Sequence, residues 1–175
     1  MISELEWKKA ISFLEGIGAP GLALDLPAFR EQALFFLGLL LEKNRVLNLT
    51  GAKDINTAFW KHLFDSLAVL SYSDLGVTLD WGCGGGFPGI PLALARKHLG
   101  DPSEVCFVDS ISKKVKAVEE FCGALELKNT RTFIGRGESL LRSQDRPTID
   151  TVVLRAVAPA ERAWRWIDRK STRLN

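Results

Sequence analysis

The apolar positions of the first 75 residues recur at intervals of three and four, the spacing of amphipathic helices. Trp7, Ile11 and Leu14 fit one helix face. A second set follows Pro27 and consists of Phe29, Ala33, Phe36, Leu37 and Leu40. A third set begins at about Asp54 and consists of Ile55, Phe59, Leu63, Leu67 and Leu70. The pattern predicts a helical N-terminal cap over residues 1–75.

From Val77 the pattern changes to short apolar runs separated by glycine turns and helical stretches. The runs predict strands at residues 77–81, 105–108, 130–134 and 149–154. Helices are predicted at residues 90–99, 112–127 and 159–169. Strands that alternate with helices indicate a parallel sheet with helices on both faces. Residues 76–175 are therefore predicted to form a doubly wound α/β domain behind the cap.

The predicted sheet ends at an open edge. After the fourth strand, only one predicted helix precedes the closing sequence Ser-Thr-Arg-Leu-Asn. An unpaired apolar edge strand favours aggregation. We therefore expect that the C-terminal strands of a complete sheet are missing, and that residues 170–175 are not native sequence.

Composition and charge are those of a soluble globular protein. The chain has 175 residues, of which 46% are hydrophobic and 25% charged, enough for one domain with its own core. The net charge of +2 is too small to indicate a polyanionic partner, although residues 155–175 hold six basic and two acidic side chains. A solvated helix face is the favoured explanation of that bias, and a phosphate contact is the alternative.

Cysteine content and the N-terminal sequence point to a cytoplasmic protein. The three cysteines lack metal-ligand spacing, which suits a reducing compartment and predicts no metal site. The N-terminus does not have the pattern of a signal peptide. The longest apolar block, residues 33–41, is too short for a membrane-spanning helix.

A glycine-rich segment directly follows the first predicted strand. It runs from Asp80 through Gly82, Gly84 and Gly86 to a predicted helix start. Glycines let the main chain approach a ligand, and a helix start offers unpaired N–H groups. Asp109 ends the second strand, where a carboxylate can accept hydrogen bonds from ribose hydroxyls. The two strand ends predict a site for a nucleotide-bearing cofactor; the alternative is a tight turn without a ligand.

The position of Asp80 favours one cofactor class over another. Residues 84–89 match the dinucleotide pattern G-x-G-x-x-G literally, a weak signal by itself. A carboxylate at the strand end would repel a pyrophosphate, but it suits a ligand with a positive end. S-adenosylmethionine, through its amino-acid part, is such a ligand. The sequence therefore predicts S-adenosylmethionine, with an NAD(P)-dependent oxidoreductase as the alternative.

Several motifs together resemble the RsmG/GidB family of bacterial methyltransferases, and the resemblance covers residues 29–158. They are Asn48-Leu49-Thr50, His62-x-x-Asp65-Ser66, Asp80-x-Gly82-x-Gly84-x-Gly86-Phe87-Pro88-Gly89-Ile90-Pro91, Asp109-Ser110, Lys113-Lys114 and Arg155-Ala156. The resemblance implies a Rossmann-like class I fold and methyl transfer to guanine N7 in small-subunit (16S) ribosomal RNA. We expect this RNA as the partner, no membrane, and a monomer. Because family members continue with further strands, a truncated, non-catalytic module that binds cofactor or RNA is a second alternative.

The resemblance also implies which residues contact the cofactor. These are Gly82, Phe87, Gly137, Glu138 and Arg155. The glycine turn and the second strand end add Gly84, Gly86 and Asp109. The structural alternatives are that Phe87 is a core residue and that Arg155 forms a surface ion pair. No catalytic acid or base is predicted, because N7 of guanine carries no proton.

Further polar residues near this region have more than one interpretation. His62, Asp65 and Ser66 share one helix face. A packing role is favoured for His62, and bracing of the cofactor loop is the alternative. Lys113 and Lys114 are expected near the cofactor edge, either in contact with RNA phosphate or on a solvated face.

Overall fold

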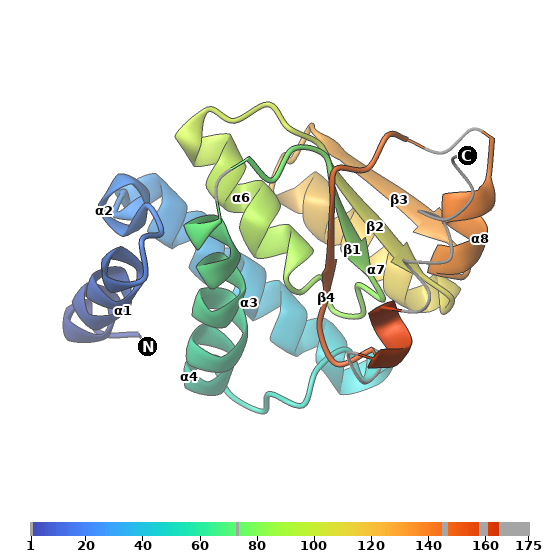
Figure 1. Cartoon of the computed structure of the whole chain (residues 1–175). Helices are drawn as coiled ribbons and strands as arrows, with labels where there is room; N and C mark the ends of the chain where they lie inside the picture. Colours follow the sequence, from blue (N-terminus) through green and yellow to red (C-terminus); the bar gives the residue numbers. More distant parts are fainter. Residues whose placement is uncertain (1, 73, 145–146, 158–160, 165–175) are drawn as a thin grey trace.

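The computed structural model describes residues 2–72, 74–144, 147–157 and 161–164 and contains a parallel four-stranded sheet among helices (Figure 1). The strands are β1 (Thr78–Trp81), β2 (Val105–Asp109), β3 (Thr130–Ile134) and β4 (Thr151–Leu154). Their order is β3-β2-β1-β4. The chain therefore runs outward from β1 in one direction through β3 and then crosses to the other side for β4. In such sheets, ligands bind beyond the carboxyl ends of the strands at this point of reversal.

Helices cover both faces of the sheet, which confirms the predicted α/β class. α6 (Gly89–Leu99) and α7 (Ser112–Ala124) pack on one face, where both contact β2. α8 (Gly137–Arg142) also contacts β2. Its Leu141 joins a separate apolar cluster with Leu79, Trp81, Cys106 and Val108. The fold is Rossmann-like.

The N-terminal segment is helical, as predicted, but its last part is irregular. α1 (Glu4–Gly16), α2 (Gly21–Leu24) and α3 (Pro27–Leu47) come first and lie on the α6 side of the sheet (Figure 1). The single helix expected from Asp54 is instead a series of short pieces. These are α4 (Ile55–Ala58), a π-helical segment (Phe59–Phe64), α5 (Asp65–Leu67) and a 3₁₀ turn (Ala68–Ser71).

One buried apolar cluster joins the N-terminal helices to the sheet domain. Phe36 of α3, Phe59 of the π-helical segment and Phe107 of β2 all belong to it. The division at residues 75 and 76 stays a prediction, because this core is shared. The predicted helix at 159–169 lies mostly outside the described residues, of which 161–164 are helical. Within the described part of the chain, no helix is long and apolar enough to cross a membrane.

Asp80 ties the end of β1 to the start of α6. Its side chain is fully buried, and Oδ2 accepts a hydrogen bond of 2.8 Å from the backbone N–H of Gly89. A Cβ at Gly89 would lie 2.7 Å from that oxygen and would overlap the ring of Phe107. Only glycine lets the helix begin this close to the strand. The contact closes the glycine-rich loop at both ends.

Asp80 should make the stability of the fold depend on pH. Burial raises the pKa of the Asp80 carboxyl from 3.8 to about 7. Between these values the folded state binds more protons than the unfolded state, so the free energy of unfolding falls as pH rises. In Asp80→Asn this contribution is absent. Urea unfolding at pH 5, 6, 7 and 8 should therefore show that the stability of Asp80→Asn, relative to the native chain, rises with pH; parallel curves would contradict the assignment.

Candidate cofactor site

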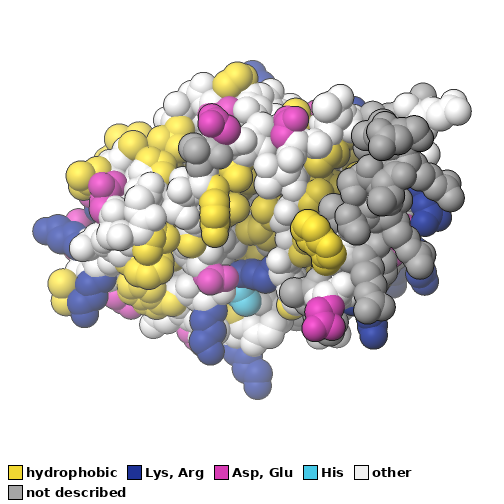
Figure 2. Space-filling model, viewed as in Figure 1, with side chains coloured by type: hydrophobic (Ala, Val, Ile, Leu, Met, Phe, Trp, Pro, Cys, Tyr) yellow, Lys and Arg dark blue, Asp and Glu magenta, His cyan; other side chains and the backbone are white. Residues whose placement is uncertain are grey.

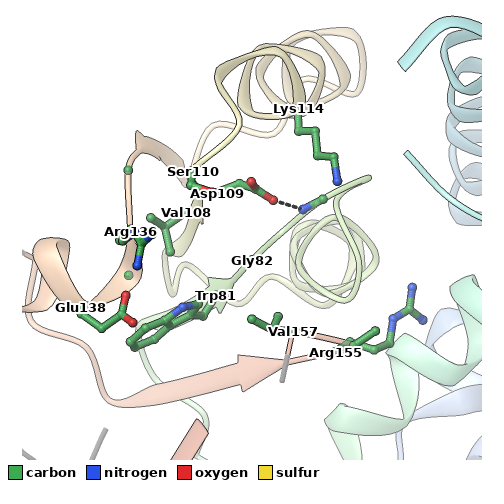
Figure 3. Close-up of a pocket in the computed structure, with 14 residues that line it drawn as sticks. Trp81, Gly82, Val108, Asp109, Ser110, Lys114, Arg136, Glu138, Arg155 and Val157 are labelled. Atoms are coloured by element: carbon green, nitrogen blue, oxygen red, sulfur yellow. Dashed lines mark hydrogen bonds between the residues drawn. The ribbon is translucent and has the colours of Figure 1, made fainter. Parts of the chain in front are cut away.

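A cavity of about 410 Å³ lies at the carboxyl ends of the four strands (Figure 3). Trp81 ends β1 and Asp109 ends β2, whereas Gly135 follows β3 and Arg155 follows β4; all four residues line the cavity. Sites for small molecules typically measure about 300–1,000 Å³. The cavity therefore has the size and the position expected of a cofactor site in this fold.

Gly82 begins the turn above β1. Its φ of +75° lies in the left-handed region, which residues with a Cβ adopt at a cost. A Cβ here would also lie 2.6 Å from Cγ2 of Val157. Its N–H donates to the Val108 carbonyl at 2.7 Å, so the turn is fixed to the end of β2. Gly82 thus exposes bare backbone to the cavity for both conformational and steric reasons.

Asp109 connects the glycine turn to the start of α7. Its Oδ2 accepts from the Gly84 N–H at 3.0 Å, the dashed bond in Figure 3. Its Oδ1 accepts from the Ile111 N–H at 2.9 Å. Each carboxylate oxygen has two lone pairs, so each can accept one more hydrogen bond. Asp109 can therefore bind vicinal hydroxyls, such as those of a ribose, while it holds the loop.

The walls of the cavity carry charges of both signs. Asp109 and Glu138 are acidic, whereas Lys114, Arg136 and Arg155 are basic. Figure 3 shows Arg136 and Glu138 on the side of the Trp81 ring and Lys114 on the opposite side. Mixed charges suit a ligand that carries an ammonium, a carboxylate and a sugar. Gly137, which precedes Glu138 at the start of α8, also lines the cavity.

Two of the expected cofactor residues do not line the cavity. Phe87 is 5% exposed, and its ring centroid lies 5.3 Å from that of Phe36. It therefore occupies the core position that the sequence left open as the alternative to ligand contact. Gly86 closes the turn through an N–H bond of 2.6 Å to the Cys83 carbonyl. Asp80, whose charge was expected to meet the ligand, points instead to Gly89.

Arg155 directs its guanidinium toward the π-helical segment, as Figure 3 shows. Nη2 lies 3.1 Å from His62 Nδ1. Nη1 donates to the Lys61 carbonyl at 3.2 Å and pairs with Asp65 Oδ2 at 3.3 Å. The guanidinium also lies over the Phe87 ring, 5.0 Å from its centroid. The ion pair considered from the sequence is therefore present, in a residue that also lines the cavity.

Seven lining residues are not among the site residues predicted from the sequence. They are Trp81, Val108, Ser110, Gly135, Arg136, Ala156 and Val157. Each lies at or just after the carboxyl end of a strand, so the rule that sites gather at these ends is the signal that finds them. Lys114, expected near the cofactor edge, does line the cavity.

The glycine turn leaves open space beside the carboxylate acceptors of the cavity. The space in front of Gly84 is open, since a Cβ there would meet only the Gly82 carbonyl oxygen, at 3.8 Å. Carboxylate acceptors lie on two walls, at Asp109 and Glu138. Among the residues that the structure describes, no group of three or more His, Cys, Asp or Glu side chains could hold a metal ion.

Comparison with known proteins identifies relatives of one kind. The family model described as rRNA small subunit methyltransferase G matches residues 30–173. Proteins named ribosomal RNA small subunit methyltransferase G are similar to this chain. That of Deinococcus radiodurans is 41% identical over 145 residues, which is 81% of this chain and 56% of the relative.

Two further relatives give the same result. The protein of Lachnoclostridium phytofermentans is 36% identical over 151 residues, 84% of this chain and 60% of the relative. That of Legionella pneumophila is 37% identical over 146 residues, 83% of this chain and 67% of the relative. The matched part of the chain thus spans roughly three fifths of the length of these relatives.

Replacing Gly82 by alanine should abolish cofactor binding. The new Cβ would strain the left-handed backbone, by about 1 kcal/mol, and would also collide with Val157. Gly100 is a matched control, because its φ is +72° but nothing lies within 4 Å of a Cβ there. Calorimetry should find no binding of S-adenosylhomocysteine to Gly82→Ala and native affinity in Gly100→Ala. Native affinity in Gly82→Ala would exclude this turn from the site.

Asp109→Asn should weaken the binding of S-adenosylhomocysteine by about tenfold or more, because one acceptor and the negative charge are lost. Asp101→Asn is the matched control. Asp101 also accepts from the N–H two residues ahead, that of Ser103 at 2.8 Å, but it does not line the cavity. Calorimetry on both variants measures the difference, and an equal effect of the two substitutions would contradict a ribose-binding role.

Proposed function

Because the chain belongs to the rRNA small subunit methyltransferase G family, we propose that it binds S-adenosylmethionine and methylates N7 of a guanine in small-subunit ribosomal RNA. The single observation that carries the proposal is the cavity at the carboxyl ends of the strands, bounded by the Gly82 turn and Asp109. The family match does not favour the nicotinamide-dependent alternative.

The chain's residues supply two kinds of contact for the cofactor. Asp109 accepts hydrogen bonds from the ribose hydroxyls, and Glu138 offers a second acceptor on the α8 side. The bare backbone at Gly82 and Gly84 allows close approach of the remainder of the ligand. When bound, S-adenosylmethionine supplies an electrophilic methyl group for in-line attack by the guanine N7 lone pair.

This reaction makes few chemical demands on the side chains. N7 carries no proton, so methylation there requires no general base. Catalysis then depends on holding the base and the methyl donor in line, beside the apolar side chains of Trp81 and Val157 in the cavity wall.

The RNA is proposed to contact the basic residues that lie around the cavity. Lys114, Arg136 and Arg155 line it, and cationic side chains position nucleic acid through phosphate contacts. Figure 2 shows further Lys and Arg side chains along the lower edge of the face, near the end of α3 and α4 in Figure 1. N7 lies in the deep, narrow groove of an A-form duplex. The target guanine is therefore proposed to lie in a loop or an opened strand.

Incubation with 16S ribosomal RNA and S-adenosylmethionine should produce N7-methylguanine at one position. Reduction followed by aniline cleavage at nucleotide resolution detects this base, because the methylated ring is cationic and opens readily. Asp109→Asn should reduce the yield, whereas Asp101→Asn should leave it unchanged. Naked RNA and the assembled small subunit serve as separate substrates. A chain that binds S-adenosylhomocysteine but methylates neither substrate would instead be a non-catalytic module.

A further inference from the structure

His62 lies outside the cavity, but its Nδ1 lies 3.1 Å from Nη2 of Arg155, a residue of the cavity wall. It belongs to the π-helical segment Phe59–Phe64, and its ring centroid lies 5.0 Å from that of Phe87. π-Helical turns often occur at functional sites. Methyl transfer to N7 gives this histidine no acid or base role, so its contacts require another explanation.

The hydrogen bonds of His62 assign its proton. A guanidinium only donates, so Nδ1, which lies 3.1 Å from Arg155 Nη2, is the acceptor. Nε2 lies 2.6 Å from Thr50 Oγ1 and therefore carries the hydrogen that it donates to this hydroxyl. The ring is thus neutral, with its single N–H on Nε2.

The surroundings favour this neutral form. Burial lowers the pKa of His62, and the positive charge of Arg155 from the end of β4 lowers it further. On its own element, a hydrogen bond with the Lys61 backbone and the charge of Asp65 act in the opposite direction, whereas the charge of Lys61 has a smaller effect in the same direction. The Thr50 hydroxyl and the Phe87 ring carry no charge. A protonated ring could not accept from Arg155 and would repel it.

Arg155 leads directly into the cavity wall. The next residue, Ala156, has a φ of +56°, which is uncommon for a residue with a side chain. Such backbone persists only where its surroundings hold it. Val157 follows and packs against the Gly82 turn, and both Ala156 and Val157 line the cavity. A fixed Arg155 therefore determines where this wall lies.

We propose that His62 is a positioning residue, whose neutral ring holds Arg155 and thereby the Arg155–Val157 wall of the cofactor cavity. This inference rests on the proposed function insofar as it takes the cavity as the cofactor site. Protonation of His62 removes the acceptor and sets two cations side by side, which releases the wall.

The pairing is tested first without any ligand. The chain has two histidines, and their ring signals can be followed by NMR across pH. In Arg155→Met the pKa of His62 should rise, because the neighbouring charge is gone. His98 is the internal reference, since its partner is Gln32 at 2.9 Å. An unchanged His62 pKa in Arg155→Met would overturn the pairing.

The effect on the cavity is tested by calorimetry with S-adenosylhomocysteine. His62→Leu should weaken binding by about tenfold, as expected when a hydrogen bond to a charged group is lost. His62→Asn should retain most of the affinity, because its Oδ1 takes the place of Nδ1. His98→Leu, the control, should bind as the native chain does. In the Arg155→Met background, His62→Leu should have no further effect.

Several results would overturn the proposal. One is that His62→Leu binds S-adenosylhomocysteine with native affinity. Another is that His62→Leu reduces this affinity by the same factor in the native chain and in the Arg155→Met background. The pH dependence of binding gives a further readout. Acidification should weaken the binding of S-adenosylhomocysteine more in the native chain than in His62→Asn. Parallel plots of affinity against pH for the two proteins would contradict the positioning role. Failure of the proposed function has a different signature, namely no binding of S-adenosylhomocysteine by the native chain.

Discussion

The buried hydrogen bond between Asp80 and the Gly89 N–H is the constraint on which the cavity at the strand ends depends. This bond of 2.8 Å joins a side chain of β1 to the first residue of α6, so the residues between them must form a compact loop. Burying this carboxyl is unfavourable, which its raised pKa shows. Within the described structure, its second oxygen has no hydrogen-bond partner. Such an unsatisfied group costs about 1–3 kcal/mol, so the fold maintains the loop geometry at the expense of stability.

The same loop geometry explains why the cavity is lined by backbone and carboxylate groups. With its ends tied together, the loop turns back over the sheet through left-handed backbone at Gly82 and Gly84. The N–H groups of these residues then point to acceptors on β2, the Val108 carbonyl and the Asp109 carboxylate. Asp109 therefore holds the loop and also lines the cavity.

The sequence predicted helices and strands well where one local pattern of residues dominates. It predicted them poorly where contacts between distant parts of the chain determine the local structure. β3 was predicted with its observed bounds, Thr130–Ile134, because turn residues delimit a run of β-formers. α8 has six residues, too few for a helical period to show. The π-helical segment kept the apolar spacing of an α-helix, so periodicity could not distinguish the two. A cavity lies at the strand ends, where the topology predicts a site. The partner of Asp80 was not predictable, since a carboxylate in a glycine loop can face either a ligand or a helix start.

Arg155 shows why side-chain roles are harder to predict than site location. Its partners, Lys61, His62 and Asp65, lie about ninety residues earlier in the chain, and only the tertiary fold brings them together. Through these contacts the N-terminal segment is connected directly to the wall of the cavity. A reaction that needs alignment, and no proton transfer, benefits most from rigid walls. The N-terminal segment therefore contributes to the position of the cavity wall, because its Lys61, His62 and Asp65 contact Arg155 directly after β4.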